Sequence, residues 1–99
     1  MFSVLLSVYY RESPIYFTQS LNSVFSQTRP PSEVVLVQDG PLTKELDSVI
    51  TSFISQYPSI FKVVKLSTNQ GLGKALNEGL KYCSNDYVAR MDTDDIAKP

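Results

Sequence analysis

The sequence predicts an α/β fold, a three-layer α/β/α sandwich built around a mainly parallel sheet. Short apolar runs rich in Val and Leu recur along the chain, and stretches with helical periodicity separate them. Prolines or polar turn residues mark most of the boundaries. Strands that alternate with helices imply right-handed crossovers between parallel strands. We therefore expect the order β-α-β-α-β-α-β in a single domain over residues 1–99.

The chain begins with a predicted strand and helix. Residues 3–9 are almost continuously apolar, which is typical of a strand covered on both faces. Ser13 is the expected N-cap of the helix, with Pro14 as its first residue. Apolar residues then follow at helical spacing, and Pro30 and Pro31 cannot continue the helix.

The same alternation continues to the end of the chain. Further strands are predicted at residues 33–38, 61–66 and 87–91, with a helix over about residues 43–57 between the first two. A last helix follows the loop at 69–73, and its expected core face carries Leu72, Ala75, Leu76, Leu80 and Cys83.

Composition excludes several classes of function. Nine Lys plus Arg residues stand against ten Asp plus Glu residues, so the net charge of -1 argues against a nucleic-acid partner. No His is present, which excludes His-based triads and His-containing zinc sites. The lone Cys83 fits a reducing compartment, and no apolar run reaches the ~18 residues of a membrane span. A cytoplasmic location is expected.

Polar residues follow three of the predicted strands, at their carboxyl ends. They are Tyr9 to Glu12, Asp39 with Gly40, and Asp92 to Asp95. Ligands of open parallel sheets bind beyond these ends, near the point where the strand order reverses. The sequence therefore brings residues that are distant along the chain to one candidate ligand edge.

The cluster Asp92-Thr93-Asp94-Asp95 predicts a site for a hard divalent cation, Mn²⁺ or Mg²⁺. In an extended backbone Asp92 and Asp94 point to the same side, so both can address one metal. A solvated acidic turn at a strand end is the alternative.

Three other residues at this edge each have two interpretations. Asp39 fits either an acceptor for a base or ribose, or a turn residue before Gly40. Tyr9 fits either a stacking partner for a base or a strand-end aromatic that covers the core. Lys74 could reach an anion near a helix N-terminus, or be a solvated Lys after a glycine-rich turn. The surrounding NQGLGK matches neither the P-loop nor the dinucleotide fingerprint.

Several segments together resemble glycosyltransferase family 2 enzymes with the Rossmann-like GT-A fold. The match begins with residues 4–9 (VLLSVY), 21–27 (LNSVFSQ) and 33–40 (EVVLVQDG). It continues with residues 69–79 (NQGLGKALNEG) and 87–95 (YVARMDTDD), in the same order and spacing. Residues 38–42 (QDGPL) look closest to a branch linked to bacterial exopolysaccharide and capsule assembly.

The resemblance implies a set of site residues and a reaction. The nucleotide-sugar site would comprise Val8, Tyr9, Glu12, Asp39, Gly71, Lys74, Asp92 and Thr93, with Asp94 and Asp92 at the metal. The implied reaction is inverting transfer from a nucleotide sugar, with a UDP-sugar favoured, to a saccharide or lipid-linked saccharide. Lipid-linked acceptors would place the enzyme at the periphery of the inner membrane.

The sequence also departs from the family pattern. Gln38 stands where many relatives have a first acid, and Pro41 stands where they have a Ser. Family members run well over twice this length, so residues 1–99 correspond to the nucleotide-sugar-binding portion. The general base is expected beyond residue 99, no catalytic residue is assigned, and we expect no turnover by this portion alone. The fourth strand should present an open edge that favours dimerisation.

Two alternative functions are a nucleotidyltransferase and a non-catalytic nucleotide-binding α/β module. A nucleotidyltransferase would be expected to carry a glycine-rich, basic loop after the first strand, and residues 10–13 (YRES) are not such a loop. A phosphoacceptor receiver domain would place its acids after the first and third strands. Here the acids follow the second and fourth.

Overall fold

The computed structural model describes residues 1–91, and these form strands and helices in the expected alternation. The elements are β1 (Ser3–Val8), α1 (Pro14–Phe25), β2 (Glu33–Gln38), α2 (Lys44–Gln56), β3 (Phe61–Lys65), α3 (Leu72–Leu80) and β4 (Val88–Met91). All paired strands are parallel, and their order in the sheet is β3-β2-β1-β4. The α/β class and the β-α-β-α-β-α-β order are confirmed.

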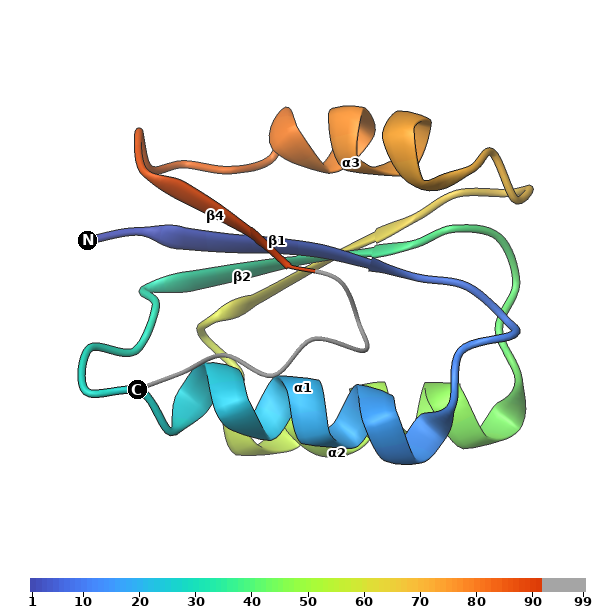
Figure 1. The fold of residues 1–99 in the computed structure, drawn as a ribbon, viewed down its shortest axis with the longest axis horizontal. Helices are drawn as coiled ribbons and strands as arrows, with labels where there is room; N and C mark the ends of the chain where they lie inside the picture. The colour runs from blue at the N-terminus through green and yellow to red at the C-terminus, as the bar shows by residue number, and fades with distance from the viewer. Residues whose placement is uncertain (92–99) are drawn as a thin grey trace.

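The sheet lies between two layers of helices (Figure 1). Helices α1 and α2 cover one face, and α3 covers the other. Ser13 caps α1 as expected, because its Oγ accepts a hydrogen bond from the Tyr16 N–H at 3.4 Å. Thr43 caps α2 in the same way, with its Oγ1 accepting from the Leu46 N–H at 3.2 Å.

The central strands β1 and β2 are buried along their whole length, as their apolar sequences predict. Alternate side chains point to opposite faces, so each strand contributes to two clusters. The cluster under α1 and α2 contains Val4, Leu6, Val8, Phe17, Leu21, Val24, Val34, Leu36, Leu46, Ile50 and Phe53. The smaller cluster under α3 contains Leu5, Val35, Val37 and Ala75.

Helix α3 differs from the sequence-based expectation in the face that it buries. Leu72 and Leu80 were expected in the core, but they are 51% and 40% exposed. The buried residues of α3 are Ala75 and Gly79. A Cβ at Gly79 would lie only 2.5 Å from Leu5 Cδ1 and from Val37 Cγ2, so the helix backbone packs directly on the sheet. Such close packing selects small residues for the buried face and moves the larger leucines outward.

The strand order reverses between β1 and β4. The first two crossovers extend the sheet from β1 through β2 to β3, whereas the third returns to the other side of β1. The register places Leu6 of β1 opposite Met91 of β4. The carboxyl ends of these two neighbouring strands therefore flank the topological switch point, where ligands of open α/β sheets bind. None of the helices described is long and apolar enough to cross a membrane.

Candidate nucleotide-binding site

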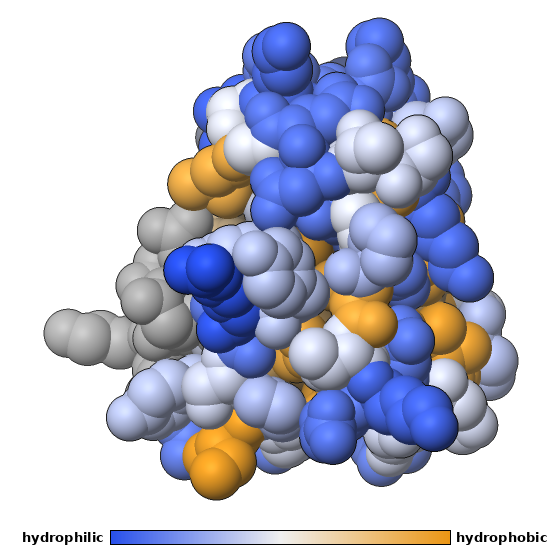
Figure 2. Space-filling view, turned by 90° about the vertical axis from the view of Figure 1, so that its right-hand side faces the viewer, coloured by the Kyte–Doolittle hydropathy of each residue, from blue (hydrophilic) through white to orange (hydrophobic). Residues whose placement is uncertain are grey.

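The candidate site lies at the carboxyl-terminal edge of the sheet, on the right-hand side of Figure 1. The ends of β1 and β2 are joined here, because the Asp39 N–H donates to the Val8 carbonyl at 2.8 Å. The Leu66 N–H donates to the Gln38 carbonyl at 2.9 Å, which brings in the end of β3. Figure 2 looks onto this side of the molecule, where hydrophilic and intermediate residues predominate and hydrophobic residues form separate spots.

The segment after β1 presents two tyrosines to solvent. Val8 is buried, whereas Tyr9 is 37% exposed and Tyr10 47% exposed. The rings pack edge to face, with centroids 5.9 Å apart and planes at 77°. A turn closes behind them because the Glu12 N–H donates to the Tyr9 carbonyl at 3.0 Å. Tyr9 is therefore only partly covered, and part of the residue is exposed to solvent at this edge.

Asp39 makes contacts that neither sequence-based interpretation foresaw. Its side chain does not close the local turn at Gly40. Instead Oδ1 accepts the Gln70 N–H at 2.7 Å and Oδ2 accepts the Gly71 N–H at 3.1 Å. Asp39 is only 4% exposed. Its carboxylate thus links the end of β2 to the loop that precedes α3.

The loop before α3 brings two of the expected site residues to this edge. Gly71 is the N-cap of α3 and has φ +94°, a conformation that favours glycine. The Asn69 side-chain oxygen also accepts the Gly71 N–H, at 3.1 Å. Gly71 and Lys74 are both exposed. The structure therefore brings Val8, Tyr9, Asp39 and Gly71 to one edge, with Lys74 in the first turn of α3.

The predicted metal residues Asp92 and Asp94, together with Thr93, lie outside the described residues. Within residues 1–91, no group of three or more His, Cys, Asp or Glu side chains could hold a metal ion. The metal site therefore stays a prediction from the sequence. Oxygen donors of this kind fit the ligand preference of Mn²⁺ and Mg²⁺.

The opposite edge of the sheet holds a buried ionic network that sequence reasoning missed. The Glu33 side chain is 10% exposed. Its carboxylate accepts hydrogen bonds from Ser3 Oγ at 2.7 Å and from the Ser84 N–H at 2.8 Å, and it pairs with Lys62 Nζ at 2.7 Å. Burial by itself would raise the pKa of Glu33, but the hydrogen bonds from Lys62, Ser84 and Ser3 outweigh it and lower the pKa from 4.5 to about 2. The sequence offered one signal of this network, because Glu33 is a charged residue at the start of a mainly apolar strand.

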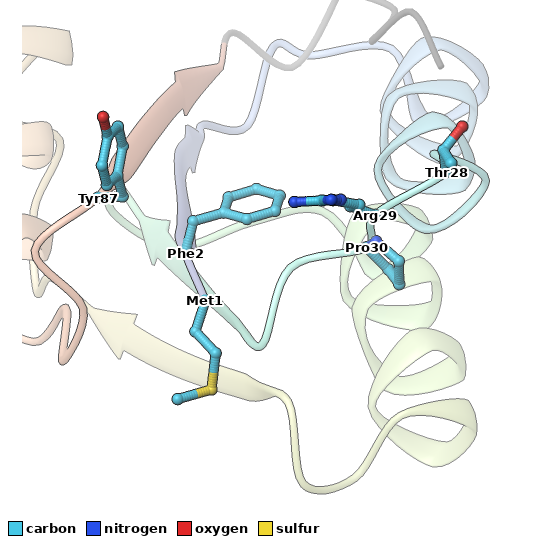
Figure 3. A pocket seen from close by; sticks show the side chains of 6 residues that line it. All are labelled: Met1, Phe2, Thr28, Arg29, Pro30 and Tyr87. Atoms are coloured by element: carbon cyan, nitrogen blue, oxygen red, sulfur yellow. The ribbon is translucent and has the colours of Figure 1, made fainter.

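Two further features lie near this opposite edge, away from the candidate site. A pocket of about 560 Å³ is lined by Met1, Phe2, Thr28, Arg29, Pro30 and Tyr87, and Figure 3 shows Phe2 and Arg29 pointing toward one another. Cys83 is partly buried, and that burial together with the Glu33 carboxylate raises the pKa of its thiol. A thiol of this kind is poorly reactive, which is consistent with a structural role.

The fold is a Rossmann-like α/β sandwich of the GT-A type, with its candidate site at the topological switch point. Residues 3–99 match the family described as "Glycosyl transferase family 2". The chain belongs to this family, as its motifs predicted.

Curated relatives of the chain are bacterial glycosyltransferases. An uncharacterized glycosyltransferase of Haemophilus influenzae is 51% identical over 98 residues, which cover 99% of this chain and 36% of the relative. The amylovoran biosynthesis glycosyltransferase AmsE of Erwinia amylovora is 48% identical, with coverage of 100% and 36%. The UDP-Gal:alpha-D-GlcNAc-diphosphoundecaprenol beta-1,3-galactosyltransferase of Escherichia coli is 45% identical, with coverage of 96% and 34%. The chain thus spans about a third of the length of these relatives.

Solved structures show the same fold. The S. aureus protein TarS, residues 1–349, in complex with UDP superposes with a TM-score of 0.81 at 34% identity, covering 96% of this chain and 28% of that protein. A mannosyltransferase from Pyrobaculum calidifontis, solved with GDP-Man and Mn²⁺, gives a TM-score of 0.84 at 23% identity, with coverage of 99% and 28%. At 23% identity, the likeness to the mannosyltransferase shows a shared fold alone.

Proposed function

We propose that residues 1–99 are the donor-binding portion of an inverting glycosyltransferase that takes part in bacterial surface polysaccharide synthesis. The observation that carries the proposal is the convergence of Tyr9, Asp39 and Gly71 at the switch-point edge of a family 2 chain. UDP in the related TarS structure, and UDP-Gal in the name of the Escherichia coli relative, favour a UDP-sugar as donor.

Each residue of the proposed donor site has a distinct part. Val8 and the exposed Tyr9 ring would receive the base, and Glu12 would help to hold the nucleotide from the turn behind them. Gly71 and Lys74 would face the diphosphate, because a helix N-terminus and a lysine both favour anions. Asp39 would accept a hydrogen bond from the base or the ribose, and Asp92 and Thr93 would complete the site after β4.

The carboxylates Asp94 and Asp92 would hold a divalent cation, Mn²⁺ or Mg²⁺. When bound, such a cation neutralises charge on a diphosphate leaving group. The proposal is supported by the spacing of two aspartates directly after a strand that borders the switch point.

The acceptor would be a saccharide or a lipid-linked saccharide, the latter suggested by the diphosphoundecaprenol in the name of the Escherichia coli relative. Inverting transfer needs a base within hydrogen-bond reach of the acceptor hydroxyl, about 2.6–3.2 Å. The described acids at the donor edge have other roles in the proposed site. We therefore place the base in a part of the enzyme beyond residue 99 and propose that residues 1–99 alone do not transfer sugar.

The test is calorimetric titration of UDP into the chain with and without Mn²⁺, beside Asp94→Asn. We expect binding that depends on the metal and that Asp94→Asn weakens at least tenfold, because the variant loses a charged ligand. Asp86→Asn removes the same charge at the opposite edge and should bind as the parent does. If the folded chain does not bind UDP, the proposed donor site is wrong for this nucleotide, and GDP and dTDP are the next ligands to test.

A further inference from the structure

The turn between α3 and β4 is held by the Glu33 carboxylate, which lies at the start of β2. Glu33 accepts hydrogen bonds from the Ser84 N–H at 2.8 Å and from the Ser84 Oγ at 3.0 Å. Lys62 of β3 pairs with Glu33, and its Nζ also donates to Ser84 Oγ at 2.7 Å. The same Nζ donates to the Tyr82 carbonyl at 3.1 Å. The turn is therefore bonded to the starts of β2 and β3 through one buried acid and its lysine.

The next residue of the turn bonds to a third strand. The Asn85 side-chain amide donates to Ser3 Oγ at 2.9 Å and to Ser32 Oγ at 3.0 Å. Ser3 opens β1, and its N–H donates to the carbonyl of Tyr87, the residue before β4, at 2.9 Å. Ser3 Oγ also donates to Glu33, so Asn85 belongs to the same network. We give the name β4 anchor to Ser3, Glu33, Lys62, Ser84 and Asn85.

Strand β4 has little of its own to fix its pairing with β1. It has four residues, none of them fully buried, and among residues 1–91 it pairs with β1 alone. A buried face normally holds a strand in register, because a slip of one residue moves every side chain to the other face. Since β4 lacks such a face, the bonds at its start are an independent source of register (Figure 1).

We propose that the β4 anchor fixes the pairing of β4 with β1 and thereby places the carboxylates Asp92 and Asp94 for the divalent cation. Glu33 and Asn85 are then positioning residues, which act on the metal site from the other end of the strand. The inference rests on the proposed function, since it specifies how that metal site is organised.

The sequence makes the link between the strand and the carboxylates short. β4 ends at Met91, and Asp92 is the next residue. A slip of β4 by one residue would move the chain that follows by about 3.3 Å. Distances from a metal to its ligands tolerate changes of only about 0.2 Å, so such a slip would disrupt the site.

The test measures Mn²⁺ affinity in the presence of UDP, from the electron-spin signal of free Mn²⁺, together with amide hydrogen exchange. Asn85→Ala removes the bonds to Ser3 and Ser32 and leaves the pair between Glu33 and Lys62 in place. We expect exchange at the β4 amides that pair with β1 to become about tenfold faster, and Mn²⁺ affinity to fall about fivefold. Glu33→Gln should change both measurements in the same direction, because its amide nitrogen cannot accept from Lys62.

Thr43→Ala is the matched control for a general loss of stability. It removes the side-chain cap of α2, which lowers stability without altering the β4 anchor. It should leave Mn²⁺ affinity unchanged, as well as the rate of exchange in β4 relative to that in β2. Exchange in the core of β2 verifies that each variant is folded.

The remaining outcomes separate the inference from the proposed function. Unchanged Mn²⁺ affinity in Asn85→Ala and Glu33→Gln would overturn the positioning role and leave the proposed function intact. Weaker Mn²⁺ binding with unchanged exchange in β4 would also overturn it, because the affinity would then not depend on the pairing of β4. An equal loss of affinity in Thr43→Ala would do the same, since general destabilisation would account for it. If the unmodified chain binds neither UDP nor Mn²⁺, the proposed function fails and the inference fails with it.

Discussion

Glu33 shows how a single buried charge can make the stability of a small domain depend on pH. Its folded-state pKa lies near 2, below the ordinary 4.5. A depressed carboxylate pKa stabilises the folded state fully above pH 4.5, and the contribution is lost as the pH falls through about 2. We expect the free energy of unfolding to decrease over this window.

The variant Glu33→Gln tests this expectation by chemical denaturation between pH 2 and pH 7. It should destabilise the chain by about 2 kcal/mol at neutral pH, because Lys62 and the Ser84 N–H lose a charged acceptor. It should also flatten the dependence of stability on pH below 4.5. Glu78→Gln is the control, because its 2.9 Å pair with Lys81 is largely solvent-exposed and should contribute less than about 1 kcal/mol. An unaltered pH profile in Glu33→Gln would contradict the assignment.

Helix α3 carries two glycines in different surroundings, Gly73 and Gly79. A Cβ at Gly79 would meet Leu5 and Val37 at 2.5 Å, whereas a Cβ at Gly73 would meet nothing within 4 Å. We expect Gly79→Ala to destabilise the chain by about 1–2 kcal/mol, because overpacking outweighs the gain in helix propensity. Gly73→Ala should stabilise it by about 0.5–1 kcal/mol through propensity alone.

Thermal unfolding of both glycine variants measures this difference directly. The two changes add the same methyl group to the same helix, so intrinsic propensity largely cancels between them. Equal stabilisation by both would show that α3 does not pack against the sheet as closely as described.

Among residues 1–91, strand β4 forms one edge of the sheet. Among the described residues β4 pairs only with β1, and its Ala89 and Arg90 are exposed. Charged side chains on an edge strand disfavour pairing with another chain, and the opposite edge strand, β3, carries two of them, Lys62 and Lys65, whereas β4 carries one, Arg90. We therefore propose that the 99-residue chain dimerises through β4.

Light scattering over a range of concentrations tests the dimer. We expect the mass to rise toward that of a dimer, and Ala89→Lys to shift the midpoint upward about tenfold, because charge on an open edge opposes pairing. Asn77→Lys, an exposed position on α3, should leave the midpoint unchanged. A constant monomer mass up to high concentration would rule out the proposal.

The amino-acid pattern was sufficient to predict the type and order of the elements, the cap at Ser13, and the edge at which polar residues gather. These features depend on local periodicity and turn chemistry, which can be recognised within a few residues. The family motifs were also recognisable from the sequence. The roles of Asp92 and Asp94 stay predictions, because those residues lie outside the described part of the chain.

The folded chain was needed to establish the strand order β3-β2-β1-β4, the buried face of α3, and the partners of Asp39 and Glu33. Asp39 bonds to residues 31 and 32 positions away, and Glu33 bonds to Ser84, 51 positions away. Contacts of this range come from the packing of whole elements, and no local pattern specifies which backbone groups will meet a given carboxylate. The short distance between α3 and the sheet determined which residues of the helix are buried. A helix that packs this close to a sheet accepts glycine and alanine where periodicity alone favours leucine.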